Sequence, residues 1–140
     1  MFQKPYFLPG FVFLVLTAIL HVLAVIFHLY WDFWWFDSLV HLLAGICVAL
    51  MSLWFFYFSN IVKSVELSSF GIFVRLIFIT LIVGIIWEIF EFQFGISFRH
   101  SASFFVYVFE TASDLIMDLI GAIVIGFIAT YRLEDLTDKI

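Results

Sequence analysis

Four long apolar stretches determine what kind of protein this chain can form. They run over residues 8–30, 36–58, 70–94 and 111–131 of a 140-residue chain that is 66% hydrophobic and 12% charged. A helix needs about 20 mainly apolar residues to cross the roughly 30 Å hydrocarbon core of a bilayer. Each stretch reaches that length. The sequence therefore predicts an all-α integral membrane protein, a four-transmembrane-helix bundle that forms one domain over residues 1–140.

The remaining composition excludes several classes of function. Only six Lys and Arg residues are scattered along the chain, so no nucleic-acid partner is expected. Cys47 is the single cysteine and lies in an apolar run, which favours a small buried residue and excludes an internal disulfide. The first apolar stretch is too long for a signal-peptide core, so we expect it to be retained as a helix.

The basic residues predict how the bundle is oriented. With four spans, both termini and the connection between the second and third spans share one side of the membrane. That side holds Lys4, Lys63, Arg132 and Lys139, with Arg75 at the near end of the third span, whereas the opposite side holds only Arg99. The positive-inside rule then predicts that both termini are cytoplasmic. We expect a multi-pass protein of the bacterial cytoplasmic (inner) membrane.

Ionisable residues interrupt these apolar stretches at a similar depth, in the outer half of the membrane. They are His21 and His28 in the first span, Asp37 and His41 in the second, Glu88 and Glu91 in the third, and Glu110, Asp114 and Asp118 in the fourth. Spacings of three, four or seven residues place the members of each span on one helix face. Charged groups are costly in hydrocarbon and usually mark function, so these faces should point inward and converge.

Carboxylates that converge at low dielectric cannot all stay ionised without a counter-charge. Protons, basic side chains or a bound cation can supply it, and the acids outnumber the basic groups on that side of the membrane. We therefore predict a divalent metal site for Zn, Mn, Fe or Mg. The predicted ligands are Asp37, His41, Glu88, Glu91, Asp114 and Asp118, with His28 and Glu110 as further candidates.

Several of these residues also have a structural interpretation. Asp37 and Glu110 lie at helix starts, where an acid caps the helix and complements its dipole. His21 is better explained as a polar packing residue that hydrogen-bonds across helices than as a ligand. The small residues Gly84 and Gly121 permit close helix approach.

The order of the motifs resembles a known family pattern. Asp37-x-x-x-His41 is followed by Trp87-Glu88-x-x-Glu91, an aromatic linker, and Asp114-x-x-x-Asp118-x-x-Gly121-Ala122. This pattern is similar to that of the VanZ-like small bacterial membrane proteins, especially the YjdF-like inner-membrane proteins, and covers residues 36–126. The chain departs from it at Asp118, where VanZ-like proteins carry Asn, and at Glu110, where YjdF-like proteins tend to have Asp. The resemblance implies the fold and the position of the site rather than a reaction.

Three functions fit this pattern, and the sequence leaves open whether the protein is an enzyme. The first is a metal-dependent hydrolase or transferase that acts on a lipid or isoprenoid headgroup, with Glu88 or Glu91 as general base. The aromatic linker over residues 96–109 would lie in the interface or gate access to the site. The second is a cation or proton transporter or sensor, in which an oligomer could complete the pathway. The third is a non-catalytic assembly partner of another membrane protein.

The orientation can be tested by labelling. We expect a cysteine introduced near Ser101 to react with an impermeant thiol reagent added from outside, because the connection between the third and fourth spans should face outward. Reaction only after lysis would reverse the predicted topology.

Overall fold

The computed structural model describes residues 6–59, 68–96 and 103–137, and the regular elements in these ranges are all helices. In chain order they are α1 (Phe7–Ile26), α2 (Leu29–Asp32), α3 (Phe36–Leu53), the π-helical turn η1 (Trp54–Phe58), α4 (Ser69–Phe94) and α5 (Phe104–Thr137). Four helical segments are long and apolar enough to cross a membrane: Phe7–Ile26, Phe36–Phe58, Ser69–Phe94 and Phe104–Tyr131. The predicted all-α bundle of four membrane-spanning helices is confirmed.

The first span is shorter than the sequence suggests. α1 ends at Ile26, four residues before the predicted end, because His28 adopts a left-handed backbone conformation with φ of 59°. This conformation is unfavourable for residues with a Cβ atom and cannot continue a right-handed helix. The chain therefore turns and forms the short helix α2 before α3 begins.

The ends of α4 follow ordinary capping chemistry. The Ser68 hydroxyl accepts a hydrogen bond from the backbone N–H of Gly71 at 3.2 Å, which satisfies one free donor of the first turn. At the other end Gly95 has φ of 63°, and its N–H donates to the carbonyl of Glu91. Glycine suits this left-handed position because it has no side chain to clash.

The last helix begins earlier than its hydrophobicity suggests. α5 starts at Phe104 rather than at residue 111, so the aromatic half of the expected linker forms the first turns of the helix. Phe104, Phe105 and Phe109 are strongly exposed on these turns, as lipid-facing aromatic side chains can be. A freely moving lid is therefore not formed by residues 104–109, and residues 97–102 of the linker lie outside the described ranges.

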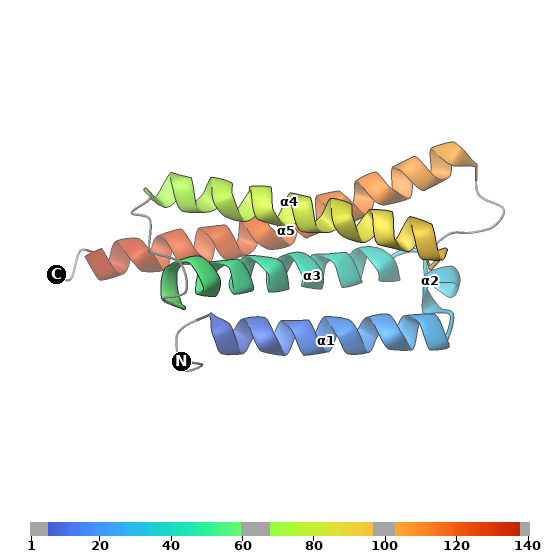
Figure 1. The fold of residues 1–140 in the computed structure, drawn as a ribbon, viewed down its shortest axis with the longest axis horizontal. Coiled ribbons are helices and arrows are strands. Elements are labelled where there is room, and N and C mark those ends of the chain that lie inside the picture. The colour runs from blue at the N-terminus through green and yellow to red at the C-terminus, as the bar shows by residue number, and fades with distance from the viewer. Residues whose placement is uncertain (1–5, 60–67, 97–102, 138–140) are drawn as a thin grey trace.

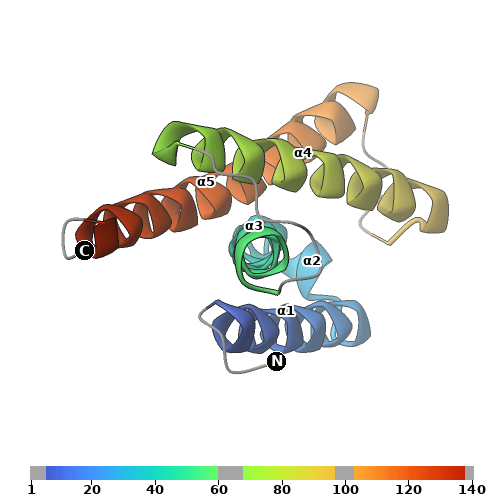
Figure 2. The ribbon, with the colours of Figure 1, turned by 60° about the vertical axis from the view of Figure 1, so that its left-hand side comes forward.

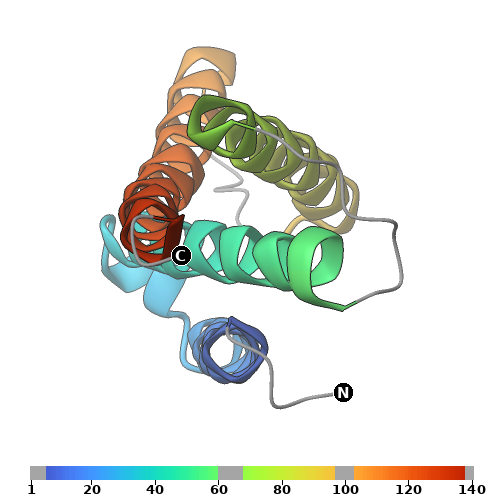
Figure 3. The ribbon, with the colours of Figure 1, turned by 90° about the vertical axis from the view of Figure 1, so that its left-hand side faces the viewer.

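The helix α3 forms the centre of the bundle. Figures 1 and 2 show it between α1 on one side and the crossing pair α4 and α5 on the other. Seen along the bundle, α1 packs on α3 and stands apart from α4 and α5 (Figure 3). α1 begins and α5 ends at the same end of the bundle (Figure 1), as four antiparallel spans require. Which side of the membrane that end faces stays a prediction.

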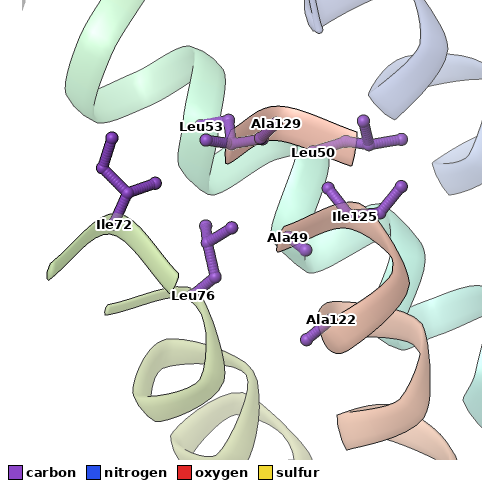
Figure 4. Packing of buried hydrophobic residues seen from close by; sticks show 8 residues of the cluster. All are labelled: Ala49, Leu50, Leu53, Ile72, Leu76, Ala122, Ile125 and Ala129. Atoms are coloured by element: carbon purple, nitrogen blue, oxygen red, sulfur yellow. The ribbon is translucent and has the colours of Figure 1, made fainter. Parts of the chain in front are cut away.

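The half of the bundle nearest the start of α1 and the end of α5 has an apolar core. Its buried side chains come from α3, α4 and α5 and interdigitate, as Figure 4 shows. They are Ala49, Leu50, Leu53, Ile72, Leu76, Ala122, Ile125 and Ala129. The predicted ligands on α3, α4 and α5 lie beyond this core, toward the α2 end.

Glycines allow α3 and α5 to touch at the backbone. A Cβ atom added to Gly45 of α3 would overlap the carbonyl group of Asp118 in α5. A Cβ atom added to Gly121 of α5 would lie 2.6 Å from the carbonyl oxygen of Leu42. Small residues commonly permit such close approach between membrane helices. The expectation for Gly121 is supported, and Gly45 is the partner position that the sequence analysis did not identify.

We expect Gly45→Ala to destabilise the fold, because the backbone of α5 must move to admit the methyl group. Overpacking of this kind typically costs about 1–3 kcal/mol of unfolding free energy. Gly10→Ala is the matched control, since its methyl group would meet the flexible side chain of Met51 rather than backbone. Thermal unfolding in detergent measures both variants, and equal unfolding midpoints would contradict the assigned contact.

Candidate metal centre

His41 is the centre of the ionisable residues inside the bundle. It lies in the second turn of α3 and is 2% exposed. Its Nδ1 atom is 3.2 Å from Asp118 Oδ2 on α5, and its Nε2 atom is 3.5 Å from Glu88 Oε1 on α4. Asp37 Oδ1, one turn earlier on α3, lies 3.8 Å from the same Nε2. Three helices therefore bring carboxylates to one imidazole ring.

Two further acids complete what we call the carboxylate–histidine cluster. Glu91 offers a ligand atom that lies within 4.8 Å of those of Asp37 and His41, and Asp114 offers one within the same distance of those of His41 and Glu88. Glu91 is 3% exposed and Asp114 is 5% exposed. The cluster consists of Asp37, His41, Glu88, Glu91, Asp114 and Asp118, which are the six residues predicted from spacing and depth.

The contact between His41 and Asp118 fits a ring that carries a proton on Nδ1. In that form His41 Nδ1–H donates to Asp118 Oδ2. In a neutral ring the lone pair then resides on Nε2, which points toward Asp37 and Glu88. A histidine whose other nitrogen donates to a carboxylate is the usual arrangement of metal-bound histidine.

Two neutral hydroxyl groups orient carboxylates of the cluster. Thr111 Oγ1 donates to Glu88 Oε2 at 2.8 Å, which leaves Oε1 facing His41. Ser38 Oγ donates to Asp114 Oδ1 at 3.3 Å. Neither residue is among the ligands predicted from the sequence. Ser38 lies three residues before His41, and Thr111 lies three before Asp114 and seven before Asp118, so the same face-sharing spacing could have identified them.

The two further candidate ligands lie outside this centre. His28 is exposed, and its Nδ1 atom lies 3.2 Å from the carbonyl oxygen of Val25, because the left-handed turn directs the ring away from the bundle. Glu110 is half-buried and lines a cavity of about 350 Å³, which we call the end cavity. Asp37 and Asp114 also line it. Glu110 therefore lies near the entrance to the cluster rather than within it.

His21 behaves as a packing residue, as expected. Its Nδ1 atom shares a 2.7 Å hydrogen bond with the hydroxyl of Tyr30 in α2, and its ring meets Trp87 of α4 edge to face at 5.2 Å. Burial of Tyr30, together with the nearby carboxylates of Asp37, Glu91 and Asp114, raises the pKa of its hydroxyl. Tyr30 is therefore a neutral hydrogen-bonding wall of the end cavity.

Basic side chains are scarce around the cluster. Among the described side chains the only Lys or Arg is Arg75, and it lies over the ring of Phe56 at 5.3 Å in the opposite half of the bundle. Arg99 and the neighbouring His100 lie outside the described residues. Within the described part of the chain, five carboxylates therefore surround one imidazole.

Comparison with known families adds one finding. The family model for DUF2238, described as a predicted membrane protein, matches residues 4–135. The chain belongs to the DUF2238 family. This match covers all four spans and the whole cluster, so the DUF2238 chain is an integral membrane protein. It carries neither the VanZ-like nor the YjdF-like name, so that resemblance stays a prediction. No curated protein and no solved structure matches the chain.

Proposed function

We propose that the carboxylate–histidine cluster binds a divalent metal ion. We further propose that the protein uses this ion to hydrolyse or transfer part of a lipid or isoprenoid headgroup in the outer half of the bilayer. The observation that carries the proposal is the environment of His41 Nε2. Among the described residues, neither this atom nor Asp37 Oδ1 nor Glu88 Oε1 has a hydrogen-bond partner, although all three are buried.

A lone pair on Nε2 that faces carboxylate oxygens is repulsive, and buried polar atoms without partners are costly. Two groups of side chains have ligand atoms within 4.8 Å of one another: Asp37, His41 and Glu91, and His41, Glu88 and Asp114. A cation held by one of these groups would reduce both penalties. Ligand atoms at about 2.0–2.1 Å from a tetrahedral zinc ion lie roughly 3.3 Å apart. The distances from His41 Nε2 to Glu88 Oε1 and to Asp37 Oδ1, 3.5 and 3.8 Å, are close to this value.

A network of protonated histidine and carboxylates explains the geometry less well. A proton on Nε2 would give His41 one positive charge against five carboxylates, so several of these carboxylates would also have to be protonated at low dielectric. The resulting N–H would also lack a good acceptor, because 3.5 and 3.8 Å exceed the usual 2.7–3.2 Å range of N–H···O hydrogen bonds.

The donor set limits the metal. One imidazole with several carboxylates suits Zn, Mn, Fe or Mg, whereas Cu(I) and iron–sulfur sites favour sulfur ligands. The single cysteine, Cys47, is buried, and its thiol donates to the carbonyl of Gly10 at 3.5 Å. It therefore contributes nothing to this set.

The surroundings of the cluster support chemistry on a lipid headgroup. A bound divalent ion would polarise a phosphoryl or carbonyl group and lower the pKa of a bound water. Thr111 orients Glu88 as a metal ligand, and Glu91 then serves as the general base for that water. In hydrolysis of a phosphate ester, the water oxygen bonds to phosphorus and its proton passes to Glu91. The bond to the leaving alcohol breaks, and the alcohol takes up that proton.

The end cavity offers space for the headgroup. Asp37, Ser38 and Asp114 form its polar wall, and aromatic residues of the first turns of α5, Phe105 and Phe109, form its apolar wall. Sites that combine apolar walls with a few convergent polar groups are typical of small-ligand binding.

The alternative functions have less support. Transport needs a path through the other half of the bundle, where Leu53 and Leu76 are about 1% exposed in a packed apolar core. An assembly role needs acids that can reach a partner's basic helix, but Glu88, Glu91 and Asp118 are at most 7% exposed.

We expect the purified protein to hold stoichiometric divalent metal and Glu88→Gln to lose it. Removing an outer hydrogen-bond partner of a ligand typically costs 10–100-fold in metal affinity, so loss of a ligand should cost more than about 100-fold. Glu110→Gln is the matched control, because it makes the same change outside the cluster. Elemental analysis after dialysis measures the metal.

Thermal stability gives an independent readout of the same site. Metal at 100 times its dissociation constant should stabilise the folded protein by about 2.7 kcal/mol. Wild-type protein without metal, and with an unfolding temperature that divalent ions do not change, would refute the metal centre.

We expect expression of the protein to change the lipid profile of the host membrane and Glu91→Gln to suppress that change. General base catalysis typically contributes about 10²–10⁴-fold to rate, so turnover should fall by that factor. Glu91→Gln should keep at least part of its metal, which separates loss of the base from loss of the ion. Mass spectrometry of lipid extracts provides the measurement. An unaltered lipid profile combined with cation flux into liposomes would favour transport instead.

A further inference from the structure

A second cavity, of about 330 Å³, lies between α1, α3 and α4, and we call it the lateral cavity. Most of its wall is apolar, but it reaches the carboxylate–histidine cluster, since His41 and Asp118 both line it. Neither the end cavity nor the proposed metal chemistry accounts for it.

The lateral cavity is open along the side of the bundle. α1 packs mainly on α3, so Figures 2 and 3 show its backbone separated from the backbone of α4. Lining residues on both helices are exposed: Leu14 and Val22 of α1 are 47% and 53% exposed, and Val83 of α4 is 40% exposed. In an integral membrane protein that flank of the bundle faces hydrocarbon.

The shape of the lateral cavity is elongated along the bundle. Its lining residues on α3 run from Val40 to Val48, which spans about 12 Å at 1.5 Å per residue. The Val40 end adjoins the cluster, and the Val48 end points toward the apolar core. The edge-to-face contact between His21 and Trp87 lies at the cluster end, where it bridges α1 and α4.

We propose that the lateral cavity binds one hydrocarbon chain of a membrane lipid, which enters sideways between α1 and α4 with its polar end at the cluster. This inference rests on the proposed function, because it supplies the chain-binding part of the same lipid site. The headgroup of such a lipid would lie in the end cavity, and its chain would extend from there toward the middle of the bilayer. Lipids in the surrounding leaflet have the same orientation.

Other occupants fit the cavity poorly. A helix of a second protein is about 10 Å across, and the contact between His21 and Trp87 bridges α1 and α4 at the cluster end of the cavity, where such a helix would have to pass. Ordered water needs two to four polar partners, and the wall away from His41 and Asp118 offers mainly apolar side chains.

Photo-crosslinking in nanodiscs of phosphatidylcholine tests the proposal. One arm contains phosphatidylglycerol with a diazirine in the middle of one acyl chain, and the other contains a polyprenyl phosphate with a diazirine in its chain. We expect one of these probes to crosslink to residues 14–22, 40–48 or 80–87, and the reactive probe identifies the chain as acyl or isoprenoid. Failure of both probes to label these segments would overturn the proposal.

Matched variants distinguish crosslinking inside the cavity from crosslinking at the general lipid-facing surface. Ala44→Phe fills the cavity from α3 and should reduce the crosslinks at least about tenfold. Ala112→Phe adds the same volume at an exposed position of α5 that does not line the lateral cavity, and should leave them unchanged. Val83→Phe fills the cavity from its exposed side and serves where Ala44→Phe does not fold. Crosslinks that persist in the folded filled variants would also overturn the proposal.

Metal content, measured on the same samples, distinguishes the two proposals. Crosslinks in the cavity of a protein that holds no metal would support the chain site and refute the metal centre. If metal is bound but neither Ala44→Phe nor Val83→Phe lowers the crosslinking yield, the chain site is refuted and the metal centre is not.

Discussion

The hydrogen bond from His41 to Asp118 is the interaction on which the site depends. With a proton on Nδ1, this bond leaves Nε2 directed at carboxylates from two helices, α3 and α4. The ring cannot turn away from those carboxylates without losing its bond to Asp118.

Asp118 can hold the ring only because three helices approach each other unusually closely around it. Gly45 contacts the backbone of Asp118, and a Cβ atom at Gly84 would lie 2.6 Å from its carboxylate oxygen Oδ2. Any larger residue at these positions would displace the carboxylate or separate the helices. The small residues therefore do more than tighten the membrane bundle, since they also set the distance between the imidazole and its partner on the facing helix.

The sequence predicts the bundle and the membership of the cluster because both follow from simple periodicity. Hydrophobic length defines the spans, and alternating direction places Glu88, Asp114 and His41 at one depth. His28 has the same depth and the same kind of spacing, but its left-handed backbone ends α1 and turns it outward, which hydrophobicity does not reveal. Thr111 was overlooked because a hydroxyl is common in membrane helices and becomes informative only when its partner is known. The metal and the reaction stay predictions, because neither spacing nor burial specifies them.

The division of the bundle into an apolar half and a polar half determines which chemistry it can support. Leu53, Leu76 and Ile125 are buried in the apolar half, whereas His41 and the carboxylates of the cluster lie in the other half. The two cavities that meet the cluster differ in character, since the end cavity carries Asp37 and Asp114 whereas the lateral cavity is mainly apolar. A soluble substrate would need only the first, and hydrocarbon alone would need only the second. An amphiphile uses both, and its junction between headgroup and chain would then lie at His41, where the proposed ion acts.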